Sequence, residues 1–234
     1  MSYENLNKAT SSVESRNQTD YNNTDFYNLE KKGTRILFVG NSITLHRPKD
    51  DIGWYGNWGM AASAPEKDYV HIMQEYFLKI DVESSFAVCN AADWEREYKN
   101  IDSVIDRFTA ARDFSADIIL IKLSANTPCD GFDEKLFYES FGKFVKFLNK
   151  DGNAKILISS DFYNHPAEEC MKKYAFDNGY AFCKLSDLGE KEEMKAIGLF
   201  EHSGVANHPG DRGMKAIAER YIDCLKKNGF VKEK

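Results

Sequence analysis

The sequence has no long hydrophobic run and no large excess of positive charge. None of its apolar stretches approaches the roughly 20 residues that a membrane-spanning helix needs. Its 31 Lys and Arg against 37 Asp and Glu leave a formal net charge of −6, which argues against a general nucleic-acid binder. We therefore expect neither a membrane nor nucleic acid as a partner, and the oligomeric state stays open.

Cysteines are few, and no two of them are spaced as metal ligands. The five cysteines are widely separated, with no CxxC pair, and no HExxH motif occurs. An odd number of scattered cysteines is typical of reduced, mostly buried thiols rather than of a disulfide framework or a zinc site. The N-terminus also lacks the basic and then apolar pattern of a signal peptide. These features predict a cytoplasmic protein without a metal ion.

The remaining composition is that of a globular protein. With 42% hydrophobic and 29% charged residues, the 234-residue chain is long enough for one sizeable core and short for two. Residues 1–33 are polar with little apolar periodicity, so we expect an extension that is disordered or lies over the domain. Residues 34–234 are expected to form a single domain.

Short apolar runs and amphipathic segments alternate after residue 33. Five runs without polar alternation are typical of strands covered on both faces: 36–39, 86–89, 118–121, 156–158 and, more weakly, 181–183. Three segments carry apolar residues at helical spacing: 101–108, 137–148 and 214–225. This order predicts an α/β fold, a doubly wound sheet of about five parallel strands with helices on both faces, whose ligands bind at the carboxyl ends of the strands.

Polar residues follow the first and third of these strands. Ser42, in Gly40-Asn41-Ser42, lies near the free N–H groups of the next turn, which suits a nucleophile, although a serine there can equally cap a helix. The block is neither a Walker A loop nor a GxSxG elbow, because Thr44 stands where the second Gly belongs. Asn126 follows the third strand, where its amide either serves a turn or donates to an oxyanion.

A histidine lies in a Gly- and Pro-rich loop just before the last predicted helix. His208 is followed by Pro209, and loops of this kind often display functional side chains. A surface histidine without a role is the alternative. Together with a serine and an asparagine at strand ends, His208 is a candidate general base.

The sequence blocks around Ser42, Asn126 and His208 follow one another as in the SGNH hydrolases, also called the GDSL esterase/lipase superfamily. The chain resembles that superfamily over about residues 34 to 228. Ser42 stands at the nucleophile position, Asn126 at the oxyanion Asn, and His208 at the base. The resemblance implies a three-layer flavodoxin-like fold. It also implies ester hydrolysis through a Ser–His acyl-enzyme mechanism that needs no metal or organic cofactor.

Five positions depart from the family pattern, two of them in the third block, where Ser124 and Thr127 stand in place of the usual Gly and Asp on either side of Asn126. Asn41 replaces the Asp of the first block, Glu95 stands where an oxyanion-hole Gly is usual, and Val205 replaces the Asp that orients the base. The N–H of Glu95 would still be able to donate. For His208, either Glu201 or Asp211 orients the ring, or a main-chain carbonyl does so, or the protein is inert. We favour a working Ser–His pair with a substituted orienting group.

The insert after Ser42 suggests what the site accepts. Trp54, Trp58 and Trp94 follow predicted strands, and their rings either stack on sugar rings or pack the loops against the domain. We expect these tryptophans and Asn41 to bind substrate. The Gly-rich, polar insert favours a small acyl group, such as acetyl, on a polar alcohol such as a carbohydrate. The alternatives are acyl transfer to a sugar hydroxyl and a non-catalytic carbohydrate- or nucleotide-binding domain.

Overall fold

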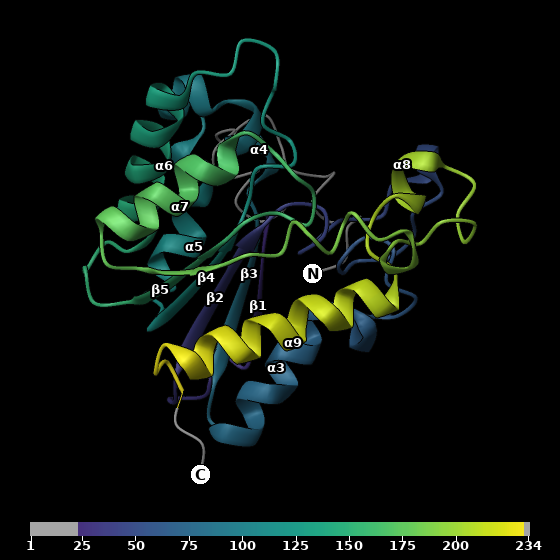
Figure 1. Ribbon diagram of the computed structural model, residues 1–234. Helices are drawn as coiled ribbons and strands as arrows, with labels where there is room; N and C mark the ends of the chain where they lie inside the picture. The colour runs from purple at the N-terminus through teal and green to yellow at the C-terminus, as the bar shows by residue number, and fades with distance from the viewer. Residues whose placement is uncertain (1–22, 232–234) are drawn as a thin grey trace, which may run out of the picture.

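A six-stranded sheet with strand order β1-β3-β2-β4-β5-β6 forms the centre of the computed structural model, which describes residues 23–231 (Figure 1). The strands are β1 (Thr24–Tyr27), β2 (Arg35–Gly40), β3 (Ser85–Asn90), β4 (Ile118–Lys122), β5 (Lys155–Ser159) and β6 (Ala181–Cys183). Strands β2 to β6 are parallel, and β1 pairs antiparallel with β3. The five predicted parallel strands are thus confirmed.

Helices cover both faces of the sheet (Figure 1). On one face lie α3 (Tyr69–Ile80) and α9 (Asp211–Lys227). The other face is covered by α4 (Ala92–Arg96), α5 (Thr109–Asp113), α6 (Glu134–Leu148) and α7 (Ala167–Asp177). Within β2, Leu37 faces the core under α6 and Phe38 faces the core under α9, so a continuous apolar run serves two layers.

The segment predicted as a helix over 101–108 has a different structure. It forms two 3-10 helices, η3 (Tyr98–Ser103) and η4 (Ile105–Phe108), and Asn100 is non-helical with φ −137° and ψ 58°. Ile101 and Phe108 nevertheless lie in the core. The apolar spacing correctly predicted the buried face, but it does not distinguish a regular helix from successive short turns.

Strand β1 comes from the segment that we expected to be an extension. Its four residues pair with β3 at the edge of the sheet and range from the buried Thr24 to the exposed Phe26, and they carry no continuous apolar run. The sheet therefore begins before the predicted boundary at residue 34. Residues 1–22 lie outside the described part of the chain.

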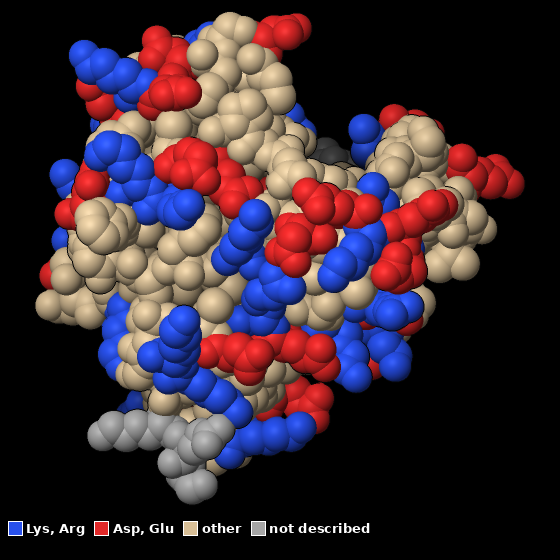
Figure 2. All heavy atoms as spheres, in the orientation of Figure 1, with Lys and Arg blue, Asp and Glu red and all other residues tan. Residues whose placement is uncertain are grey.

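The remaining short helices connect these layers. They are η1 (Asp50–Ile52), η2 (Pro65–Lys67), η5 (Glu192–Met194) and α8 (Ser203–Ala206). Over residues 23–231, no helix is both long and apolar enough to cross a membrane. The face shown in Figure 2 intermixes acidic and basic side chains, without a continuous basic surface.

Candidate active site

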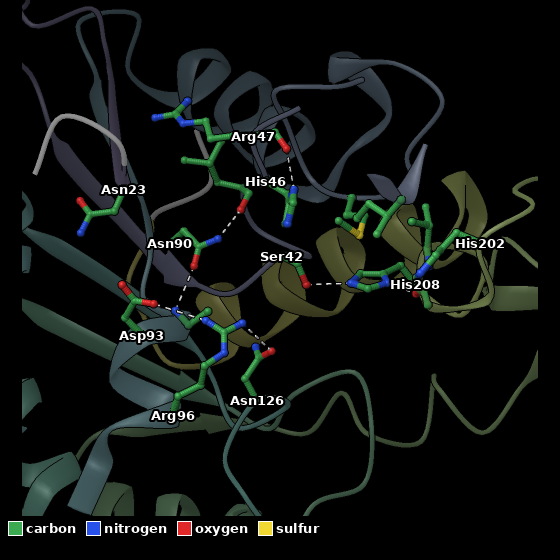
Figure 3. A pocket seen from close by; sticks show the side chains of 16 residues that line it. Asn23, Ser42, His46, Arg47, Asn90, Asp93, Arg96, Asn126, His202 and His208 are labelled. Carbon is green, nitrogen blue, oxygen red and sulfur yellow. Dashed lines mark hydrogen bonds and ion pairs between the residues drawn. The ribbon is translucent and has the colours of Figure 1, made fainter. Parts of the chain in front are cut away.

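The carboxyl edge of the sheet brings Ser42 and His208 together across 166 positions of sequence. Ser42 lies in the turn after β2, and His208 precedes α9. The Ser42 Oγ is 2.7 Å from the His208 Nε2 (Figure 3). Gly40 makes this turn possible, because a Cβ at that position would lie 1.8 Å from the Thr44 Oγ1.

A main-chain carbonyl orients the His208 ring. The His208 Nδ1 is 2.7 Å from the carbonyl oxygen of Gly204. Since a carbonyl oxygen only accepts, the neutral ring carries its proton on Nδ1, and Nε2 accepts the Ser42 hydroxyl. Of the arrangements left open by the sequence, the structure contains this one.

The two candidate carboxylates lie elsewhere. Asp211 accepts from the Ser63 N–H at 2.8 Å and from the Ser63 Oγ at 2.7 Å, and the Glu201 side chain is exposed. Val205, at the family's Asp position, is fully buried against Trp54. An apolar residue fits here because the ring's Nδ1 already has its acceptor.

Burial lowers the pKa of His208 to about 4. Desolvation disfavours the imidazolium, and the hydrogen bond to Gly204 offsets only part of this effect. The imidazole is consequently neutral at neutral pH and able to take a proton from Ser42.

Ser42 and His208 open into a pocket of about 420 Å³ that has a polar side and an apolar side. Polar side chains come from the ends of β3 and β4 and from α4, and others come from before β1 and from the insert: Asn90, Asp93, Arg96 and Asn126, with Asn23 and Arg47 (Figure 3). The apolar ones come from the insert and from α8: Leu45, Ile52, Met60 and Val205. His46 and His202 also line the pocket, and neither was singled out from the sequence. Within residues 23–231, no group of His, Cys, Asp or Glu could hold a metal ion.

Asn126 lies at this pocket, but Glu95 takes a different part from the one expected. The Glu95 N–H donates to the Ala91 carbonyl at 3.3 Å because α4 begins at Ala92, so this N–H is engaged. Its side chain accepts from the Asn126 Nδ2 at 2.5 Å. The prediction of Glu95 as a main-chain oxyanion donor is therefore wrong.

Asn41 lies beneath Ser42, not on the pocket surface. It is fully buried, and its Nδ2 donates to the Asp161 Oδ2 at 2.6 Å and to the Glu95 Oε1 at 3.2 Å. Its Oδ1 accepts from the Lys122 Nζ at 3.1 Å. Asn41 is thus part of a buried polar network and not a substrate-binding residue.

The three tryptophans also pack the domain instead of lining the pocket. Trp94 is fully buried and stacks on Phe144 with ring centroids 5.0 Å apart. Trp54 and Trp58 contact each other at 5.6 Å within the insert. Their rings contact other side chains of the domain and do not line the pocket. The expectation that they bind substrate is therefore corrected.

Comparison with solved structures identifies the fold. No family model and no curated protein sequence matches the chain. A salicylyl-acyltransferase from a tetracycline biosynthetic pathway matches with a TM-score of 0.58 and 17% identity, over 85% of this chain and 55% of that one. A G-D-S-L family lipolytic protein from Veillonella parvula matches with a TM-score of 0.53 and 13% identity, over 83% of this chain and 100% of that one. This chain has the SGNH hydrolase fold.

Carbohydrate esterases with the SGNH fold are also similar. A two-domain esterase active on acetylated mannans matches with a TM-score of 0.56 and 20% identity, over 83% of this chain and 49% of that one. A family two carbohydrate esterase from Clostridium thermocellum has a TM-score of 0.54 at 14% identity, with 83% and 63% covered. The chain spans only about half of the mannan esterase and of the acyltransferase. At these identities the similarity establishes the fold alone.

Proposed function

We propose that this protein is a serine ester hydrolase that removes short acyl groups. The observation that carries the proposal is the 2.7 Å contact between the Ser42 Oγ and a His208 Nε2 whose ring is set by the Gly204 carbonyl. A hydroxyl hydrogen-bonded to an oriented, unprotonated imidazole nitrogen is an activated nucleophile.

The reaction follows from this pair. The Ser42 Oγ attacks the ester carbonyl while its proton moves to the His208 Nε2. The Ser42 N–H and the Asn126 amide stabilise the oxyanion. The C–O bond to the alcohol then breaks, and His208 returns the proton to the leaving oxygen. His208 next takes a proton from water, which attacks the acyl-enzyme. The bond between the acyl carbon and the Ser42 Oγ then breaks, His208 returns the proton to that oxygen, and the acid leaves.

The pocket favours a small acyl group on a polar alcohol. Its volume of about 420 Å³ must hold both parts of the ester, and one side presents amide, carboxylate and guanidinium groups. Two structural neighbours are carbohydrate esterases, one of them active on acetylated mannans. We therefore infer an acetylated carbohydrate as the substrate class.

The test combines turnover with labelling of Ser42. The wild type is expected to hydrolyse p-nitrophenyl acetate, and a fluorophosphonate is expected to bond covalently to Ser42. Ser42→Ala should lose both signals and stay folded. Ser103→Ala, which changes an exposed serine, is the matched control and should keep both. A folded wild type with neither turnover nor label would overturn the proposal in favour of a carbohydrate-binding domain.

Acyl transfer is the second candidate, because a structural neighbour with a TM-score of 0.58 is an acyltransferase. In this case a sugar hydroxyl replaces water at the acyl-enzyme. Product analysis with an acetyl ester and excess free sugar distinguishes the two reactions. Acetate as the main product supports hydrolysis, and acetylated sugar supports transfer.

A further inference from the structure

A fully buried carboxylate lies directly behind the pocket. Glu95 has no exposed side chain, and its two oxygens accept from three N–H groups. These belong to the Ser124 main chain at 2.5 Å, the Asn126 Nδ2 at 2.5 Å and the Asn41 Nδ2 at 3.2 Å. Every partner is a donor, so the arrangement fits the ionised carboxylate.

The Asn126 amide is held at both of its ends. Its Nδ2 donates to Glu95, and its Oδ1 accepts from the Arg96 Nη2 at 3.3 Å (Figure 3). A flipped amide would place its NH₂ group against the guanidinium and its oxygen against the carboxylate. Both contacts would be repulsive, so only one orientation is favourable. Asn126 lines the pocket together with Ser42, and its Nδ2 has a second hydrogen beside the one given to Glu95, which is therefore available to an oxyanion.

We infer that Glu95 is a positioning residue whose ionised carboxylate holds the Asn126 amide in its oxyanion-binding orientation, and that protonation of Glu95 releases this amide. The inference rests on the proposed function for its catalytic meaning. A protonated Glu95 needs an acceptor for its O–H, and its three present partners offer only N–H groups. The carbonyl oxygen of a flipped Asn126 is an acceptor within reach, but using it removes the ordered N–H from the pocket.

The charged groups around Glu95 bear on its protonation. Asp161, after β5, faces it through Asn41 and pairs with the buried Lys122 of β4 at 3.1 Å. Arg96 lies on the far side of Asn126, and His208, neutral above about pH 4, stands across the pocket. An ionised Glu95 leaves Glu95, Asp161 and Lys122 with a net charge of −1, and protonation neutralises them.

Burial first, and the Asp161 charge second, raise the pKa of Glu95 to about 7. Because the competent state is the ionised one, activity is expected to fall as the pH drops through about 7. A fall caused by protonation of His208 alone would begin only near pH 4. The position of the acid limb of kcat/KM thus separates the two groups.

The network also explains why Asn41 replaces the family's Asp. Its Nδ2 donates to both carboxylates, which an aspartate is unable to do. A carboxylate at this position would lie between Glu95 and Asp161 and repel both. The asparagine of the Gly-Asn-Ser sequence is therefore the residue type that a buried, ionised Glu95 requires at position 41.

Kinetics of Glu95→Gln test the inference, with Glu97→Gln, an exposed neighbour, as the matched control. A glutamine keeps the shape but turns an NH₂ group toward donors. We expect kcat at pH 8 to fall by about 10- to 100-fold, less than the roughly 100- to 1,000-fold of removing one oxyanion donor outright, while KM changes little. The acid limb near pH 7 should disappear from Glu95→Gln and persist in Glu97→Gln. Full kcat in Glu95→Gln, or an unchanged limb, would overturn the inference.

A second measurement does not depend on activity. In ¹⁵N spectra of the wild type, the Asn126 side-chain amide, assigned by its loss in Asn126→Ala, should shift with a midpoint near pH 7. An amide that does not respond around pH 7 would contradict the inference even if Glu95→Gln fails to fold. If this shift occurs and Ser42 neither labels nor turns over substrate, the positioning stands and the proposed function is wrong.

Discussion

Ser124 adopts a backbone conformation that side-chain-bearing residues rarely take. Its φ is +122°, and it occupies the position where the SGNH pattern has Gly. Its N–H donates to the Glu95 carboxylate, and its buried Oγ has no hydrogen-bond partner. Strain of this kind persists where surrounding contacts enforce it, and here the contact is with the residue that holds Asn126.

Ser124→Gly is therefore expected to stabilise the protein. Relief of the strain outweighs the added freedom of the unfolded chain, for a gain of about 1 kcal/mol. This corresponds to a rise in Tm of about 2–4 °C at this chain length, with kcat unchanged. Calorimetry or thermal circular dichroism measures the shift.

Ser140→Gly is the matched control for this substitution. Ser140 is also buried with an unpartnered Oγ, but it lies inside the regular helix α6. There glycine is expected to destabilise by about 0.5 kcal/mol. Equal effects of the two changes would refute the argument from backbone strain.

Restoring the family's aspartate at Val205 is expected to harm the protein. Val205 is fully buried in an apolar cluster with Trp54 and Met60, and the His208 Nδ1 already has the Gly204 carbonyl. Val205→Asp gives up apolar burial and introduces an unpaired polar group, for a loss of about 3 kcal/mol or more. Chemical denaturation measures the loss. A stable variant with raised kcat would show that the carbonyl orients the base poorly.

The Trp54 ring packs between the two loops that form the apolar side of the pocket. Trp54, in the insert, lies 6.1 Å from Phe200, in the segment that leads to His208, and its Nε1 donates to the His46 carbonyl at 3.2 Å. Met60 and Val205 fill the space between the two loops. The insert and the loop that leads to His208 consequently keep their relative position through apolar packing.

Trp54→Ala should destabilise the fold by about 3–5 kcal/mol and lower kcat, because the His208 loop loses its packing. Trp54→Phe should retain most of the stability and most of kcat. Tyr55→Ala, which removes a ring that is 72% exposed in the same insert, should leave stability unchanged. A rise in KM for Trp54→Ala without loss of stability would instead support direct stacking on substrate.

The pocket of the assembled domain is the basis for a prediction about acyl length. It has about 420 Å³ in total, and its apolar side is formed by a few side chains packed among the loops, not by an extended aliphatic groove. We expect p-nitrophenyl acetate to be hydrolysed with a kcat/KM roughly tenfold or more above that of the octanoate ester, because added methylenes find no cavity to enter. Faster hydrolysis of the octanoate would indicate a lipase or thioesterase.

Local sequence patterns were sufficient to predict the parallel sheet and the positions of Ser42 and His208. Buried parallel strands have continuous apolar runs, and carboxyl ends of such strands meet at one edge, so Ser42 was predictable beside a β2 end. His208 was predictable from its loop before α9, and its Nε2 lies 2.7 Å from the Ser42 Oγ; the catalytic role of the two residues stays a prediction. Strand β1 was not predictable, because its pairing with β3 rests on backbone hydrogen bonds at a half-exposed edge.

Only the tertiary structure decided what surrounds that pair. A main-chain carbonyl such as that of Gly204 has no sequence signature, and the choice between it and Glu201 or Asp211 depends on how the loop folds. The Glu95 side chain meets Asn126 because α4 and the end of β4 pack side by side, and single-sequence spacing does not encode such a contact. Aromatic rings have the same chemistry in a core and at a binding surface, so whether Trp94 meets a sugar or Phe144 depends on where the finished fold puts it.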